Sequence, residues 1–213
     1  MPLTFNAKTR LLFIGDSITD CGRKQCPESI GSGYVRMVRD QLRAASPASS
    51  PVVINRGISG NKVPDLQKRW QRDVIEEKPD ILSVFIGIND VWHGLVPDRM
   101  GCALPDYVAG YRDILTQARS AFPAVELVLC EPSALWLPDP PNANDLILPY
   151  ADAVHRLARE FDVRYVVPLH RAFDAARDAR PDIAWTTDGV HPTSTGHALI
   201  ARCWLETTGL LQA

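Results

Sequence analysis

The chain alternates between short, uninterrupted apolar runs and longer stretches in which apolar residues recur every three or four positions. Short apolar runs bounded by turn-forming residues predict buried strands, and they lie at residues 11–14, 52–54, 81–86, 125–129 and 163–167. The wider spacing predicts amphipathic helices, which we expect near residues 34–46, 64–74, 107–121, 149–161 and 195–208. Pro149 is expected in or near the first turn of the fourth helix, because proline has no N–H to donate inside a helix.

Buried strands that alternate with amphipathic helices predict a five-stranded parallel sheet covered by helices on both faces, which is an α/β fold. A chain of 213 residues suits one such domain, and we expect it to span residues 1–213. Ligands of these sheets bind beyond the carboxyl ends of the strands. The functional site is therefore expected where the first three strands end, at the turns of residues 15–17, 55–61 and 87–90.

Composition and charge narrow the classes of protein that fit this fold. The formal net charge is −2, and the chain has no dense basic run that would indicate a nucleic-acid partner. The first residues lack the apolar core of a signal peptide, and no apolar run approaches the roughly 18 residues that a membrane span needs. Five cysteines without a Cys-x-x-Cys pair fit a reduced compartment. We predict a cytoplasmic protein without a membrane partner; the sequence does not distinguish a monomer from a homo-oligomer.

The first turn and a segment near the carboxyl end supply the residues of a catalytic triad. Ser17 follows a buried strand, where a side chain can stand exposed above the sheet. A serine nucleophile needs a base that a third group orients, and Asp188 lies three positions before His191. The order Ser, Asp, His is one of the known triad orders. Taken singly, Ser17 could cap a helix, and Asp188 with His191 could form a capped turn before Pro192.

Acyl transfer also needs N–H donors for the oxyanion that develops on the substrate. Gly60 can bring its backbone N–H close to a substrate because it has no Cβ. Asn89 offers a side-chain amide, and the backbone N–H of Ser17 is a third donor. Simple turn geometry would explain each of these residues alone. His93 is a rival base near Asn89, but no carboxylate lies at an evident orienting distance from it in the sequence.

Four segments in this order resemble the SGNH, or GDSL-type, esterases and acylhydrolases. They are Gly15-Asp16-Ser17, Gly60, Gly87-Ile88-Asn89-Asp90 and Asp188-Gly189-Val190-His191-Pro192. The resemblance covers nearly the whole chain and implies a flavodoxin-like three-layer α/β/α fold. It also implies that Ser17 is the nucleophile, His191 the base and Asp188 its orienter, with Ser17, Gly60 and Asn89 as oxyanion donors. The chemistry it implies needs no cofactor and no metal.

Within that family, residues 15–23, 55–70 and 86–92 are similar to the intracellular acetyl-xylooligosaccharide esterases. This likeness implies a small acylated carbohydrate as substrate. The likeness does not extend to residues 24–33 and 131–145, which border the expected site. Trp92 and Trp185 each lie three positions from a predicted site residue, and we expect their rings to bind the sugar.

Three other functions remain open on the sequence. A lipase or lysophospholipase of the same family would act on long acyl chains, although the turns near the site contain little continuous apolar sequence. A metal-dependent phosphoesterase could use Asp16, Asp20, Asp90, Asp188 and His191 around a cation, but the further histidine ligands that it would need near strand ends are missing. A non-catalytic carbohydrate-binding module would explain the tryptophans and leave the Ser, Asp and His set unexplained.

Overall fold

The computed structural model describes residues 1–211 and contains one five-stranded parallel sheet. Its strands are β1 (Arg10–Gly15), β2 (Val52–Gly57), β3 (Ile81–Phe85), β4 (Glu126–Cys130) and β5 (Tyr165–Val167). They lie side by side in the order β2-β1-β3-β4-β5, which is the flavodoxin-like order. Gly15 at the end of β1 is level with Gly57 of β2 and with Phe85 of β3. The turns that follow these three strands therefore begin at one edge of the sheet.

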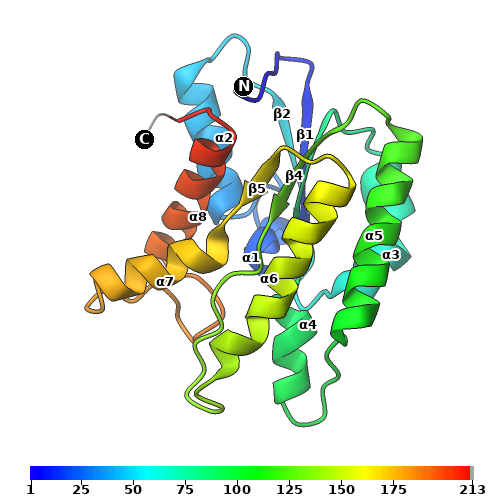
Figure 1. Ribbon diagram of the computed structural model, residues 1–213. Coiled ribbons are helices and arrows are strands. Elements are labelled where there is room, and N and C mark those ends of the chain that lie inside the picture. The colour runs from blue at the N-terminus through cyan, green and yellow to red at the C-terminus, as the bar shows by residue number, and fades with distance from the viewer. Residues whose placement is uncertain (212–213) are drawn as a thin grey trace.

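Helices cover both faces of the sheet, as Figure 1 shows. On one face lie α2 (Tyr34–Ala45), α7 (Leu169–Ala179) and α8 (Ser194–Thr207), and on the other lie α3 (Val63–Trp70), α5 (Leu104–Ala121) and α6 (Ala143–Glu160). Two short helices, α1 (Ser17–Asp20) and α4 (Ile88–Trp92), follow β1 and β3 directly. The predicted three-layer α/β/α fold is confirmed. None of the helices over residues 1–211 is long and apolar enough to cross a bilayer.

The side chains of β1 divide between two apolar cores because successive residues of a strand point to opposite faces. Phe13 packs with Tyr34 of α2 and Trp204 of α8. Ile14 belongs to the core on the other face, together with Trp70 of α3. All of these side chains are buried. The sheet is thus held on both sides, and its carboxyl edge is a rigid base for the turns.

Helix α4 lies where the sequence predicted only a turn, and three other elements also differ from the expectation. β2 continues to Gly57 through part of the predicted turn, because the buried Asn55 side chain bonds the carbonyls of Thr19 and Ile30. Helix α7 was not predicted, since it presents few large apolar residues. Helix α6 begins at Ala143, so Pro149 lies in its second turn. Pro149 is exposed, and water can therefore bond the carbonyl that proline leaves without a donor.

Candidate active site

Ser17 is held at the carboxyl end of β1 by the turn that opens α1. Asp16 caps this helix, and its Oδ1 accepts a hydrogen bond from the backbone N–H of Ile18 at 2.9 Å. Gly15 allows the turn to approach β3 closely, because a Cβ there would lie 2.2 Å from the carbonyl oxygen of Phe85. The Ser17 side chain is consequently fixed beside the end of the neighbouring strand.

Ser17, His191 and Asp188 form a continuous hydrogen-bonded chain. Ser17 Oγ lies 3.0 Å from His191 Nε2, and His191 Nδ1 lies 2.7 Å from Asp188 Oδ2. A carboxylate only accepts hydrogen bonds, so Nδ1 carries the imidazole proton. Nε2 is then free to accept the hydroxyl proton of Ser17. This arrangement can convert a serine hydroxyl into a nucleophile.

Asp188 and His191 lie in one tight turn between α7 and α8. The turn is closed by a hydrogen bond from the N–H of Thr187 to the carbonyl of His191 at 2.8 Å. Asp188 Oδ1 accepts from the backbone N–H groups of Val190 and His191. Partial burial alone would raise the pKa of Asp188, but the hydrogen bonds from His191 and Val190 hold that pKa below its usual value. The Asp188 carboxyl group is therefore ionised near neutral pH and can stabilise a protonated His191 imidazole.

The loop of residues 131–142, between β4 and α6, packs against this turn. Trp136 donates its backbone N–H to the carbonyl of Gly189 at 2.9 Å. Gly189 has φ +84°, and a Cβ there would lie 2.2 Å from the carbonyl oxygen of Trp136. The Trp136 ring lies edge-on to Phe173 and beneath the Arg177 guanidinium, and its indole N–H donates to Asp174. Only glycine fits between the turn and this anchored loop.

The three predicted oxyanion donors lie on the turns after β1, β2 and β3. Asn89 is buried in α4, and its Nδ2 donates to the carbonyl of Asn61 at 3.0 Å, which fixes the direction of the amide. Gly60 has φ +79°, and no heavy atom lies within 4 Å of the position of a Cβ. Among residues 1–211 the backbone N–H groups of Ser17 and Gly60 have no hydrogen-bond partner. These two donors are available to a substrate.

The two tryptophans predicted to bind sugar differ in their surroundings. The Trp92 ring lies edge-on to the His191 imidazole, with ring centres 5.7 Å apart, and the Arg99 guanidinium lies over the Trp92 ring, 5.7 Å from its centre. The Trp185 indole N–H donates to the carbonyl of Arg180, just after α7. Within the part of the chain that the structure describes, no hydrogen bond or ring contact joins Trp185 to His191.

The other histidines have partners of their own. His155 Nε2 lies 2.5 Å from Glu131 Oε1, and the backbone N–H of His170 donates to Glu131 Oε2, so this buried carboxylate joins the end of β4 to α6 and α7. His197 is buried, and its Nδ1 accepts from the N–H of Tyr34. Burial lowers the pKa of His197 to about 4. Partial burial, together with Arg99, also lowers the pKa of His93.

Two buried carboxyl groups lie next to the proposed donors. Asp16 precedes Ser17 and Asp90 follows Asn89, and both are at most 2% exposed. One oxygen of each has no hydrogen-bond partner among residues 1–211. Burial raises the pKa of each group to about 7. Over the same residues, no three His, Cys, Asp or Glu side chains are gathered closely enough to hold a metal ion.

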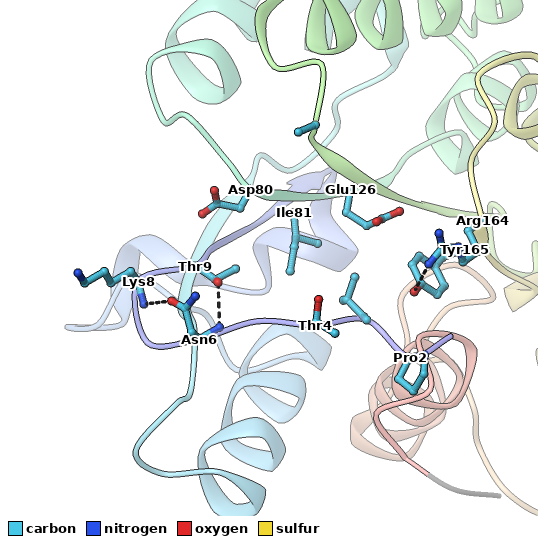
Figure 2. A pocket seen from close by; sticks show the side chains of 12 residues that line it. Pro2, Thr4, Asn6, Lys8, Thr9, Asp80, Ile81, Glu126, Arg164 and Tyr165 are labelled. Atoms are coloured by element: carbon cyan, nitrogen blue, oxygen red, sulfur yellow. Dashed lines mark hydrogen bonds between the residues drawn. The ribbon is translucent and has the colours of Figure 1, made fainter.

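A pocket of about 350 Å³ lies at the opposite edge of the sheet (Figure 2). It is lined by residues from the amino ends of the strands, including Thr9, Asp80 and Glu126. Asp80 Oδ2 already accepts a hydrogen bond there, from the backbone N–H of Arg10 at 2.7 Å. No triad residue lines this pocket. The side chains that could catalyse a reaction are therefore those at the carboxyl edge of the sheet.

Comparison with known proteins agrees with the geometry of that edge. Residues 13–199 match the GDSL-like Lipase/Acylhydrolase family. An acetylxylan esterase from Geobacillus stearothermophilus is 36% identical over 210 residues, which cover 94% of each chain. Its crystal structure aligns with a TM-score of 0.86 over 97% of each chain, at 34% identity. A structure from Parabacteroides merdae, described as a GDSL-like lipase, aligns with a TM-score of 0.90 over 99% of this chain and 100% of that one, at 36% identity.

Proposed function

Because the chain belongs to the GDSL-like lipase/acylhydrolase family and is a carboxylic ester hydrolase, we propose that it removes acetyl groups from carbohydrates with Ser17 as nucleophile. The observation that carries the proposal is the chain of two hydrogen bonds, 3.0 Å and 2.7 Å long, from Ser17 through His191 to Asp188. A cap or a surface turn would not need Ser17 to align with two side chains from a turn at the other end of the sequence.

The reaction proceeds through an acyl-enzyme. Ser17 Oγ attacks the carbonyl carbon of the ester while His191 Nε2 takes the hydroxyl proton. His191 then gives that proton to the departing sugar oxygen as the C–O bond of the ester breaks. Water attacks the acetyl-serine with His191 again as base, and acetate leaves as Ser17 recovers its proton. Asp188 stabilises the imidazolium in both halves of the reaction.

The negative charge on the carbonyl oxygen falls among three donors. The backbone N–H groups of Ser17 and Gly60 and the side chain of Asn89 come from the ends of three adjacent strands. Donors of this kind accelerate the reaction because they are already oriented before the charge develops. These donors stabilise the oxyanion best when no other negative charge lies nearby. The raised pKa values of Asp16 and Asp90 keep these two neighbouring carboxyl groups largely neutral below neutral pH.

Acetylated xylooligosaccharides are the proposed substrates. The relative from Geobacillus stearothermophilus is an acetyl-xylooligosaccharide esterase, and its catalytic mutants replace one serine, one aspartate and one histidine. Ser17, Asp188 and His191 are the same three residue types. Trp92 lies beside His191, where an aromatic face can stack on a sugar ring. Trp185 is a second candidate for binding the sugar from the side of the Asp188 turn.

The direct test compares wild-type protein with Ser17→Ala on acetylated xylooligosaccharides and on a long-chain ester. We expect acetate release from the sugar, a loss of roughly 10⁴–10⁶-fold in Ser17→Ala, and labelling of Ser17 by a fluorophosphonate. Full activity in Ser17→Ala would refute the assignment of the nucleophile. Faster hydrolysis of the long-chain ester would replace the carbohydrate esterase with a lipase that uses the same triad.

A further inference from the structure

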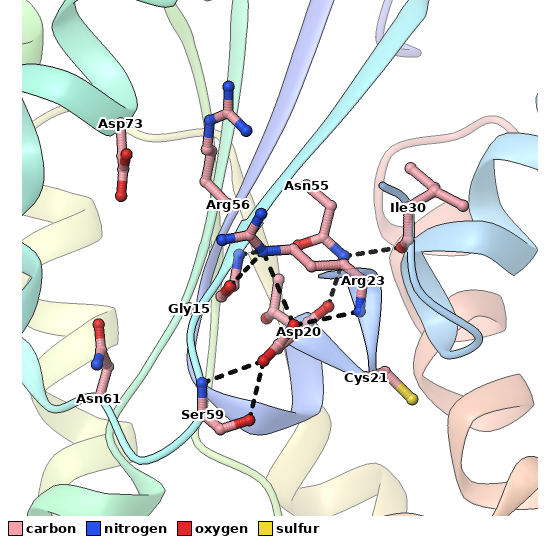
Figure 3. A network of polar contacts seen from close by, with 12 residues as sticks. Gly15, Asp20, Cys21, Arg23, Ile30, Asn55, Arg56, Ser59, Asn61 and Asp73 are labelled. Atoms are coloured by element: carbon pink, nitrogen blue, oxygen red, sulfur yellow. Dashed lines mark hydrogen bonds and ion pairs between the residues drawn. The ribbon is translucent and has the colours of Figure 1, made fainter. Parts of the chain in front are cut away.

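One buried cation, Arg69 of α3, lies behind the turns that carry the proposed oxyanion donors. The side chain is 8% exposed. Its guanidinium donates to four oxygens at 2.7–2.9 Å. These belong to the carbonyls of Gly15 and Arg56 and to the side chains of Asn61 and Asp73, all labelled in Figure 3.

Two of these bonds lead to the proposed donors by short paths. The carbonyl of Gly15 is two residues before Ser17, and the Asn61 side chain is one residue after Gly60. The carbonyl of the same Asn61 accepts the hydrogen bond that orients Asn89. A single side chain therefore connects the ends of β1 and β2 to the loop between β2 and α3, and through that loop to α4.

We propose that Arg69 is a positioning residue for the oxyanion site, a role that rests on the function proposed above. Arg69 does not touch the substrate; it fixes where the N–H groups of Ser17 and Gly60 and the Asn89 amide point. The planar guanidinium suits this task, because it holds several acceptors at fixed angles.

The far side of the same loop is also pinned. Ser59 donates its hydroxyl to Asp20 Oδ2 at 2.9 Å and its N–H to the same oxygen at 3.4 Å (Figure 3). Gly60 thus lies between two anchored neighbours, Ser59 and Asn61. Its own surroundings are open. Without both anchors, the Gly60 N–H, which has no hydrogen-bond partner among residues 1–211, would lose its fixed direction.

A purely structural role predicts a different outcome. Arg69 pairs with Asp73, and removing one partner of a buried ion pair destabilises a fold because the other charge stays behind. The exposed Arg72 pairs with the same carboxylate through bonds of 2.7 and 2.9 Å. Arg72 makes no bond to the loop among residues 1–211. Arg72 is therefore a matched control, since it shares the ion pair and lacks the link to the donors.

The experiment measures kcat and KM for a small aryl acetate in Arg69→Met, Arg72→Met and Asn61→Ala, with Ser17→Ala as reference. We expect Arg69→Met to lower kcat by roughly 10–100-fold, somewhat less than the removal of one oxyanion donor, with KM changed by less than about threefold. Arg72→Met should stay within about twofold. Asn61→Ala removes only the side-chain acceptor, keeps the carbonyl that binds Asn89, and should lower kcat in the same direction. If Arg69→Met does not fold, the kcat of Asn61→Ala tests whether the link between Arg69 and the loop positions the donors.

Coupling to Asn89 separates positioning from general destabilisation. If Arg69 acts through the donors, Arg69→Met in an Asn89→Ala background should cost less than in the wild type, because part of its effect is already lost. Hydrogen exchange at residues 58–61 should speed up in Arg69→Met and not in Arg72→Met. An Arg72→Met loss equal to that of Arg69→Met, or an unchanged kcat in Arg69→Met and Asn61→Ala, would overturn the proposal. Full activity of Ser17→Ala would instead refute the proposed function, whereas the exchange result would still report on the loop.

Discussion

Asp16→Asn should change how the stability of the protein depends on pH. Asp16 is 1% exposed, and burial raises its pKa from 3.8 to about 7; the N–H of Ile18 opposes the rise and Asp90 adds to it. One pKa unit corresponds to about 1.4 kcal/mol. A rise of about three units therefore corresponds to about 4 kcal/mol, an order-of-magnitude value.

The sign follows from proton binding in the two states. Between about pH 4 and about pH 7 the folded protein keeps the Asp16 proton and the unfolded chain has lost it. The wild type therefore becomes less stable as pH rises through this window, and the contribution levels off above the folded pKa. The asparagine side chain of the variant has no proton to lose, and its Oδ1 can still accept from Ile18. The variant should gain stability relative to the wild type by about 4 kcal/mol across the window.

Urea unfolding at several pH values measures this difference directly. Subtraction of the wild-type curve removes the carboxyl groups common to both proteins, including Asp90, apart from its coupling to Asp16. The exposed Asp178→Asn on α7 is the control, and its curve should run parallel to that of the wild type. If the Asp16→Asn curve were also parallel, Asp16 would be ionised in the fold, and the argument from burial would be wrong.

Four further outcomes are expected. Asn89→Ala should lower kcat by roughly 10²–10³-fold with a smaller change in KM; a change in KM alone would show that Asn89 binds the substrate without special contact to the transition state. Trp92→Ala should lower kcat/KM for an acetylated xylooligosaccharide by roughly 5–30-fold and for an aryl acetate much less, whereas equal losses would assign Trp92 to packing against His191. Trp185→Ala should follow the same pattern if its ring binds sugar, and unchanged kinetics would remove it from the site. Prolonged EDTA treatment should leave the rate unchanged, and recovery of a lost rate by a divalent cation would revive the phosphoesterase hypothesis.

The sequence predicted the layers and the edge of the sheet that carries the site. Apolar runs and helical spacing depend on burial, which is a local property of each segment, so the five strands could be recognised without tertiary information. The turns after β1, β2 and β3 could be brought together because parallel strands end at one edge. The hydrogen bonds from Ser17 through His191 to Asp188 lie at that edge in the structure.

The contacts that support the site could not be predicted in this way. In the sequence, the only signal at Arg69 is the aspartate four positions later. This spacing is typical of an ordinary surface ion pair on a helix. Its bonds to the carbonyl of Gly15 and the side chain of Asn61 depend on how α3 packs on the sheet. Helix α7 was missed because Leu169 and Phe173 are its only large buried apolar residues. The Glu131 carboxylate accepts a hydrogen bond from the backbone N–H of His170, which lies 39 positions away in the sequence.

The contact between Trp136 and Gly189 restricts where the chain can change in length. Residues 131–135 are buried and Trp136 is bonded to the turn of Asp188, whereas Pro138, Asp139 and Pro141 are exposed. We therefore expect insertions and loop grafts to be tolerated after residue 137 and to be harmful before it, where a shift of one residue would pull the turn away from Ser17. A library built to widen the range of substrates should vary residues 138–141 in length and keep residues 131–136 as they are.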